Sequence, residues 1–323
     1  MIFLQILKVV FQLAWFIVIT VIKWILILLG FLFVLAISLP DSSIELDYNE
    51  KSTNPFSDSL FHKIEEQWNM TSEREYTESN KLKIIKDCIA QVPVSSYTRF
   101  WRDDSNNEYQ EIFEIKNGIV CESSYNRNQL YVEYIEQQSY WRNVYSQIVK
   151  FDTTQMQFIY EKFEKVRREK ELDYAEFANM VVAFVQSIPY TLILSTSKEE
   201  AQSSGGFLQD YIENKKGPVV ENIKFGFFTP LEFLHSIRGD CDTRTLTVYS
   251  ILSHFGYDVV ILNCSVHSMI GINIPSQGKA LKYKGKKYYF WETTNTGWQP
   301  GQLPAEYDSY TDWYIALPSV NDF

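Results

Sequence analysis

The stretch that decides the fold runs Arg238-Gly239-Asp240-Cys241-Asp242-Thr243-Arg244-Thr245. Apolar residues follow it at three- and four-residue spacings as far as Phe255, which predicts a helix over residues 241–255. Asp240 is suited to cap its first turn, and Gly256 to end it in a left-handed conformation. Cys241 is therefore expected at a helix N-terminus, where the macrodipole favours thiolate over thiol.

A nucleophilic thiol needs a base, and His267 is the candidate. It lies between residues 258–264 and residues 269–274, both of which are predicted strands from their Val- and Ile-rich or alternating pattern. A third predicted strand, residues 287–293, carries Glu292. A carboxylate on a neighbouring strand can accept from an imidazole and hold its tautomer. Asp240 and Asp242 are the alternatives for this orienting role.

Each of these side chains also has a purely structural interpretation. Free cysteine is among the most buried residue types, and Cys241 could simply pack, as we expect of Cys264. A lone histidine or glutamate on a strand is equally ordinary. Catalysis is favoured because the cysteine, the histidine and the carboxylate occur together, in this order, on a predicted helix and two predicted strands.

This order resembles the transglutaminase-like branch of the papain-type cysteine hydrolases. The resemblance is carried by Gly239-Asp240-Cys241-Asp242-Thr243-Arg244, by His267-Ser268-Met269, by Trp291-Glu292-Thr293-Thr294 and, upstream, by Phe184-Val185-Gln186-Ser187-Ile188-Pro189-Tyr190. It covers roughly the C-terminal half of the chain, taking a domain as on the order of 150 residues. It implies an α+β fold in which the nucleophile helix packs on an antiparallel sheet.

The resemblance also implies roles for four residues. Cys241 would be the nucleophile, His267 the base and Glu292 the orienting carboxylate, while Gln186 would donate to the oxyanion. For Gln186 the alternative is a side chain that satisfies backbone groups where a helix ends before Pro189.

The activity that follows is that of a membrane-tethered cysteine hydrolase, a peptidase or amidase that acts through a thioester on a protein or peptide substrate. One alternative is a protein-glutamine acyltransferase, in which an amine instead of water resolves the thioester. Another is a non-catalytic domain that keeps the fold to bind a partner. No Cys-x-x-Cys pair and no His-Glu-x-x-His run occurs in the sequence, so we expect neither a metal nor a cofactor.

The N-terminal 40 residues predict a transmembrane anchor. Residues 2–39 are almost unbroken in apolar side chains, and a membrane span needs roughly 20 of them. Lys8 and Lys23 precede the most apolar part and acidic residues follow it, so the N-terminus is expected in the cytoplasm and the catalytic domain outside it. In the alternative, a hairpin of two spans would return the body of the protein to the cytoplasm. Polar residues along one stripe of the anchor could face lipid headgroups or a partner helix within the membrane.

Three further segments follow the anchor. Residues 41–80 have the composition of a polar linker, and residues 81–170 are expected to form a helical and β-hairpin segment before the catalytic domain of residues 171–323. Within the second segment, residues 96–122 predict strands around a polar turn. Three helices are predicted, over residues 127–151, 154–169 and 174–187.

Composition narrows the choice of partners. The net charge of −10 and the lack of a basic patch argue against a nucleic-acid ligand. The 46% of hydrophobic residues suffices for a sizeable core beyond the anchor. Of four cysteines, Cys241 is expected to be free, whereas Cys88 and Cys121 could form a disulfide outside the cytoplasm.

Overall fold

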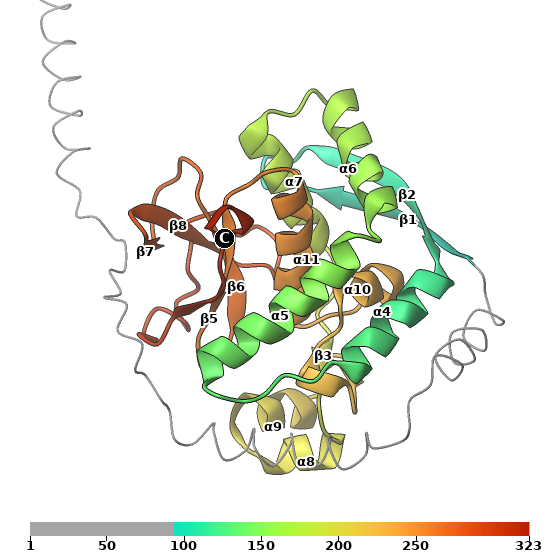
Figure 1. Cartoon of the computed structure of the whole chain (residues 1–323). Coiled ribbons are helices and arrows are strands. Elements are labelled where there is room, and N and C mark those ends of the chain that lie inside the picture. The colour runs from blue at the N-terminus through green and yellow to red at the C-terminus, as the bar shows by residue number, and fades with distance from the viewer. Residues whose placement is uncertain (1–93, 323) are drawn as a thin grey trace, which may run out of the picture. The chain divides into compact units, whose positions relative to one another are not determined.

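A five-stranded antiparallel sheet and the helix packed on it organise the structure, a computed structural model that describes residues 94–322 (Figure 1). The strand order is β7-β8-β6-β5-β9. The strands are β5 (Val259–Asn263), β6 (Ser268–Ile272), β7 (Ala280–Tyr283), β8 (Lys286–Trp291) and β9 (Tyr314–Leu317). Helix α11 (Cys241–His254) packs against β5 and β6. The predicted α+β class, with this helix on an antiparallel sheet, is confirmed.

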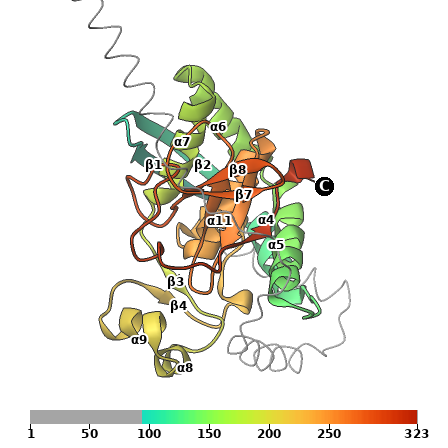
Figure 2. The same ribbon diagram turned by 90° about the vertical axis from the view of Figure 1, so that its left-hand side faces the viewer.

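The remaining elements lie outside the five-stranded sheet. The helices are α4 (Asn117–Gln129), α5 (Gln137–Thr153), α6 (Gln157–Glu169), α7 (Tyr174–Gln186), α8 (Lys198–Ser203), α9 (Gly206–Glu213) and α10 (Pro230–Ser236), with short 3-10 turns η1 (Lys224–Gly226) and η2 (Val320–Asp322). Three of these helices, α5, α7 and α10, contact α11. An antiparallel hairpin pairs β1 (Val94–Arg102) with β2 (Glu108–Lys116), and a short parallel pair joins β3 (Leu192–Ile193) to β4 (Val219–Val220). Helices α8 and α9 lie away from the five-stranded sheet in both views (Figures 1 and 2).

One core crosses the boundary that was predicted at residues 170 and 171. Its buried side chains run from Trp101 on β1 to Leu317 on β9. The ring of Phe184 on α7 lies 5.2 Å from the rings of both Trp101 and Phe113 on the hairpin, measured between centroids. Burial of each such ring contributes about 1.5–3 kcal/mol, so the hairpin is part of the same folded body as α11.

Two predicted elements differ from those observed. Residues 117–122, predicted as strand, begin α4, and the helix predicted over residues 127–151 starts only at Gln137. The reason lies in a distant partner: the buried guanidinium of Arg127 forms a two-pronged ion pair with Glu232 of α10, at 3.0 and 2.9 Å. This tertiary contact fixes the last turn of α4, and no local sequence pattern predicts the contact.

Several predictions concern residues that the structure does not describe. The anchor of residues 1–40, the linker of residues 41–80 and the first part of the 81–170 segment lie outside the described residues. Within residues 94–322 no helix combines the length and apolar character needed to cross a bilayer. Cys121 is disulfide-bonded. Cys88 of the predicted pair lies outside the described residues. Cys241 and Cys264 are free.

A buried carboxyl joins three segments of the core. Asp152 near the end of α5 accepts from the Ser123 hydroxyl at 2.6 Å and from the backbone N–H of Leu231 at 2.8 Å. Ser123 also lies 2.6 Å from the hydroxyl of Thr229, the residue that caps α10. Burial raises the pKa of Asp152 to about 7, although these hydrogen bonds oppose the shift.

The Asp152 carboxyl should make stability fall with rising pH. Its folded-state pKa is about 7 and its ordinary value 3.8, so its contribution is complete below pH 4 and lost as pH rises through 7. Asp152→Asn keeps an acceptor for Leu231 without the charge, and it should flatten this decline by up to about 4 kcal/mol. Melting temperatures of both proteins from pH 4 to 8 test this, with exposed Glu133→Gln as the control. Parallel profiles for Asp152→Asn and the unmodified protein would contradict it.

Candidate active site

The turn before α11 places Cys241 at the start of the helix. The Asp240 carboxylate accepts from the backbone N–H of Thr243 at 3.0 Å, and Gly256, with φ of 79°, follows the last turn, so both predicted caps are confirmed. A Cβ on Gly239 would lie 2.7 Å from the ring of Phe233 and 2.6 Å from the Thr243 methyl group. Only glycine fits this tight approach, which brings the chain from α10 into α11.

The pairing of β6 with β8 brings His267 and Glu292 together. Ile270 lies opposite Trp291, so the residue that precedes β6 and the residue that follows β8 meet at one edge of the paired strands. The Nε2 atom of His267 lies 2.8 Å from Oε2 of Glu292. A carboxylate can only accept, so Nε2 carries the proton and Nδ1 is the basic nitrogen.

The Glu292 carboxylate is held on both oxygens. Its Oε1 atom accepts from the backbone N–H groups of Thr293 and Thr294, at 2.8 and 2.7 Å, and from the Thr294 hydroxyl at 2.7 Å. Burial alone would raise the pKa of Glu292, but the electrostatic interaction and hydrogen bond with His267, together with the Thr294 hydrogen bonds, hold this pKa below its usual range. An ionised and immobile carboxylate is therefore available to orient the imidazole.

Aromatic packing fixes the imidazole ring as well. Tyr307 stacks on His267 with centroids 4.2 Å apart and planes 6° from parallel. His267 is buried except for 8% of its surface. The stack and the Glu292 bond together restrict the ring to one orientation.

The sulfur of Cys241 lies against the same segment. The backbone N–H of Ser268, the residue after His267, hydrogen-bonds the thiol, and Oδ2 of Asp242 lies 3.6 Å from Sγ. Burial raises the pKa of Cys241, the charges of Asp242 and Asp240 raise it further, and the Ser268 N–H only partly opposes them. The helix start was expected to favour the thiolate, but burial of the thiol and the two flanking carboxylates outweigh this effect. Deprotonation thus depends on a base.

Asp242 belongs to a buried chain of polar groups. The Tyr145 hydroxyl, from α5, donates to Oδ1 of Asp242 and accepts from the side-chain amide of Asn263 at 3.0 Å. Asp242 is therefore engaged with Tyr145, whereas Glu292 bonds His267. Of the carboxylates considered for the orienting role, Glu292 is the one that hydrogen-bonds the imidazole.

The Arg244 side chain connects three segments of the site through hydrogen bonds. Its fully buried guanidinium donates to the carbonyls of Gly239 and Val185, both at 3.0 Å, to that of Thr293 at 3.2 Å and to that of Ile188. Burial lowers its pKa to about 10. The acceptors belong to the end of α7, the turn before Cys241 and the residue after Glu292. Arg244 thereby positions Cys241 and Glu292 relative to each other.

Gln186 reaches the site in a different way from that predicted. Its side-chain amide donates to the backbone carbonyls of Glu292, at 2.7 Å, and Trp298, at 3.1 Å. Both amide hydrogens are thus in use and neither is left for an oxyanion, which matches the alternative interpretation of this residue. The Trp298 carbonyl also accepts from the indole of Trp291 at 2.8 Å, so Gln186 supports the loop behind Glu292.

The structure thus brings together Cys241, His267 and Glu292, and it adds Tyr145, Arg244 and Tyr307, to which sequence reasoning gave no role. Arg244 stood inside the quoted motif, whereas Tyr145 and Tyr307 carried no local signal. In residues 94–322 no three His, Cys, Asp or Glu side chains converge in the manner of a metal site. Comparison of the chain with protein-family models, with curated proteins and with solved structures gives no match.

Proposed function

We propose that this protein is a membrane-anchored cysteine hydrolase of the transglutaminase-like type, which cleaves a peptide or side-chain amide through a thioester. The observation that carries the proposal is the His267–Glu292 hydrogen bond beside a thiol at a helix N-terminus. A nucleophile, a base and an immobile carboxylate are the three parts that such chemistry requires.

The first half of the reaction forms the acyl-enzyme. Sγ of Cys241 attacks the substrate carbonyl carbon while Nδ1 of His267 takes the thiol proton. The oxyanion that develops is placed to accept from the backbone N–H of Cys241, which has no intrahelical acceptor because the helix begins there. As the C–N bond breaks, the imidazolium returns the proton to the leaving amine, and a thioester remains on Cys241.

The second half regenerates the thiol. Water attacks the thioester carbonyl, and His267 again takes the proton. When the C–S bond breaks, the proton passes to sulfur and the substrate leaves as a carboxylic acid. The raised pKa of Cys241 supports a path in which the base removes the proton during attack, because burial, and after it Asp242 and Asp240, disfavour a resting thiolate.

An acyl donor without specificity tests the thioester step. Incubation with p-nitrophenyl acetate should leave an acetyl group on Cys241 that hydroxylamine removes, because a thiol with an adjacent base is acylated first. Cys264 is the control within the same chain, since burial raises its pKa to about 11. Absence of the adduct would support the non-catalytic alternative.

A dansyl amine added to the same mixture distinguishes a hydrolase from an acyltransferase. Acetate as the main product fits a hydrolase, and acetylated amine as the main product fits an acyltransferase.

The compartment proposed for this site is outside the cytoplasm, with the N-terminus inside. Two observations support it. The charge bias around residues 2–39 favours that orientation, and the disulfide at Cys121 is of a kind that persists in oxidising compartments.

Labelling of intact cells tests this topology. Ser203→Cys places a thiol at an exposed position of α8, and the Cys241→Ala and Cys264→Ala background removes the two free thiols of the described part of the chain. A membrane-impermeant maleimide should label this variant in intact cells, with the background protein as the blank. Labelling only after lysis would establish the two-span hairpin and a cytoplasmic domain instead.

A further inference from the structure

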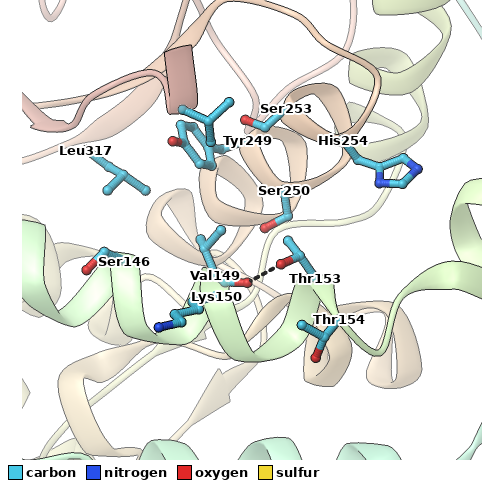
Figure 3. A pocket seen from close by; sticks show the side chains of 11 residues that line it. Ser146, Val149, Lys150, Thr153, Thr154, Tyr249, Ser250, Ser253, His254 and Leu317 are labelled. Atoms are coloured by element: carbon cyan, nitrogen blue, oxygen red, sulfur yellow. Dashed lines mark hydrogen bonds between the residues drawn. The ribbon is translucent and has the colours of Figure 1, made fainter. Parts of the chain in front are cut away.

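Helix α5 holds a tyrosine hydroxyl at a fixed place beside the start of α11. The helix packs against both α11 and β9. A pocket between α5 and α11 is lined by Ser146, Val149 and Thr153 of the first helix and by Tyr249 and Ser253 of the second (Figure 3). Tyr145, which directly precedes this lining, is fully buried, and its ring lies 5.4 Å from that of Trp141 and 5.6 Å from that of Phe227, measured between centroids. Its hydroxyl therefore has little freedom to move.

The hydrogen bonds that run from Asn263 to Cys241 make Asp242 an acceptor on both oxygens. The Asn263 amide donates to the Tyr145 hydroxyl at 3.0 Å, and that hydroxyl donates to Oδ1 of Asp242. The Cys241 thiol donates to Oδ2 of Asp242, with 3.6 Å between sulfur and oxygen. A carboxylate that accepts in this way suits a neighbouring thiol and not a thiolate, because two negative groups in contact repel each other.

His267 does not hold the thiol in the structure. Within residues 94–322 the hydrogen-bond partners of Sγ are Asp242 and the backbone N–H of Ser268, and the His267 ring is not one of them. The imidazole bonds Glu292 through Nε2. The structure thus shows a resting state in which the thiol points to a carboxylate and not to the base.

Other ionisable groups face Cys241 from the elements packed around it. They are Asp240 of the preceding turn, Arg244 of α11, Tyr190 ahead of β3, His267 ahead of β6, Glu292 after β8 and Tyr307 of the loop before β9. Tyr145 acts on the thiol through Asp242. Of all these groups, Asp242 is the one whose side chain hydrogen-bonds the sulfur, so it has the closest control over the thiol proton.

We propose that Asp242 is a positioning residue that holds Cys241 as a thiol at rest, until His267 takes the proton during attack on a substrate. Tyr145 and Asn263 keep the carboxylate in place. This step rests on the proposed function, which makes Cys241 the nucleophile and His267 the base. The consequence is protection of the nucleophile, because oxidants and alkylating agents react with the thiolate and not with the thiol.

Asp242→Asn tests the proposal, because the amide removes the charge and keeps an oxygen for the Tyr145 hydroxyl. Its nitrogen then faces Sγ as a donor, which favours the thiolate. In protein labelled with [3-¹³C]cysteine, NMR follows ionisation at the Cys241 Cβ without any reagent, and Cys241→Ala identifies the resonance. The midpoint of this titration should fall by at least about one pH unit in Asp242→Asn, the effect of removing one adjacent like charge.

Asp240→Asn is the matched control. It removes the neighbouring carboxylate and keeps a residue suited to cap α11 at the Thr243 N–H, but it leaves the contact between Asp242 and the sulfur intact. Its midpoint should therefore fall by less. An unchanged midpoint in Asp242→Asn, or equal changes in the two variants, would overturn the proposal. A Cys241 resonance that ionises at no pH at which Asp242→Asn is folded would do the same, since burial alone would then hold the proton.

Oxidation by hydrogen peroxide separates this proposal from the proposed function. At pH 7 Asp242→Asn should hold about 10-fold more thiolate, each about 3-fold less nucleophilic, so mass spectrometry should show Cys241 oxidised about 3-fold faster. Faster oxidation in Asp242→Asn, with no acetyl adduct in the unmodified protein, would contradict the proposed function alone. Adduct formation in the unmodified protein, with equal oxidation rates in the two proteins, would contradict the role of Asp242 alone.

Discussion

Replacement of Cys241 or His267 with alanine should lower kcat/KM for p-nitrophenyl acetate by about 10³-fold or more, because residues that act as one unit lose most of their effect together. Cys241→Ala removes the nucleophile, and His267→Ala leaves a thiol whose pKa burial and two carboxylates raise. The double variant should be no worse than either single one. Glu292→Gln should lose less, since its amide oxygen can still accept from Nε2 of His267.

The control for these variants is Cys264→Ala, which removes the other free thiol of the described residues and should leave kcat/KM unchanged. Circular dichroism and melting temperature establish that each protein is folded. Near-normal turnover in His267→Ala would show that another base serves Cys241, and Asp242, 3.6 Å from the sulfur, would then take that place.

Arg244→Met should destabilise the fold by at least about 3 kcal/mol, because each buried group left without its hydrogen-bond partner costs about 1–3 kcal/mol. Methionine fills a similar volume but leaves four backbone carbonyls without their donor, and each such group is costly when buried. Arg244→Lys should recover part of the loss, because an ammonium has three hydrogens but not the planar fork that reaches all the acceptors. Urea unfolding of the purified proteins measures both effects.

The control for this prediction is Arg102→Met. Arg102 is an exposed residue of the hairpin whose ion pair with Glu108 lies on the surface, so its loss should cost less than about 1 kcal/mol. If Arg244→Met does not fold, Arg244→Lys still decides the matter through its unfolding midpoint. Equal stability of Arg244→Lys and the unmodified protein would contradict the role of the fork.

The parts of the site that follow local rules could be predicted from the sequence. Capping by Asp240 and termination at Gly256 depend on residues next to the helix, and the strands adjacent to His267 and Glu292 depend on short apolar patterns. These signals lie within a few residues of what they determine. The mixed α+β class and the packing of α11 on an antiparallel sheet followed from them.

The parts of the fold and of the site that depend on contacts between distant residues could not be predicted from the sequence. Tyr145 reaches Asp242 from a helix that precedes it by about a hundred residues of chain, and the end of α4 is set by the bond from Arg127 to Glu232. The charge state of Cys241 was misjudged for a related reason: the dipole of its own helix is visible in the sequence, whereas the depth of burial is not. The hydrogen bond from the Gln186 amide to the Trp298 carbonyl likewise depends on a loop, residues 294–303, whose sequence has no periodic pattern.

The Arg244 clamp, meaning the hydrogen bonds from the Arg244 guanidinium to four backbone carbonyls, affects when the site can form during synthesis of the protein. Three of its acceptors, at Val185, Ile188 and Gly239, are synthesised before it, and the one at Thr293 is synthesised well after it. A nascent chain that has passed residue 241 but not residue 293 therefore carries the thiol without its orienting carboxylate and without a completed clamp. Under the proposed function, the cell that makes this hydrolase is protected from it throughout synthesis, since competence arrives only with the last strands of the sheet.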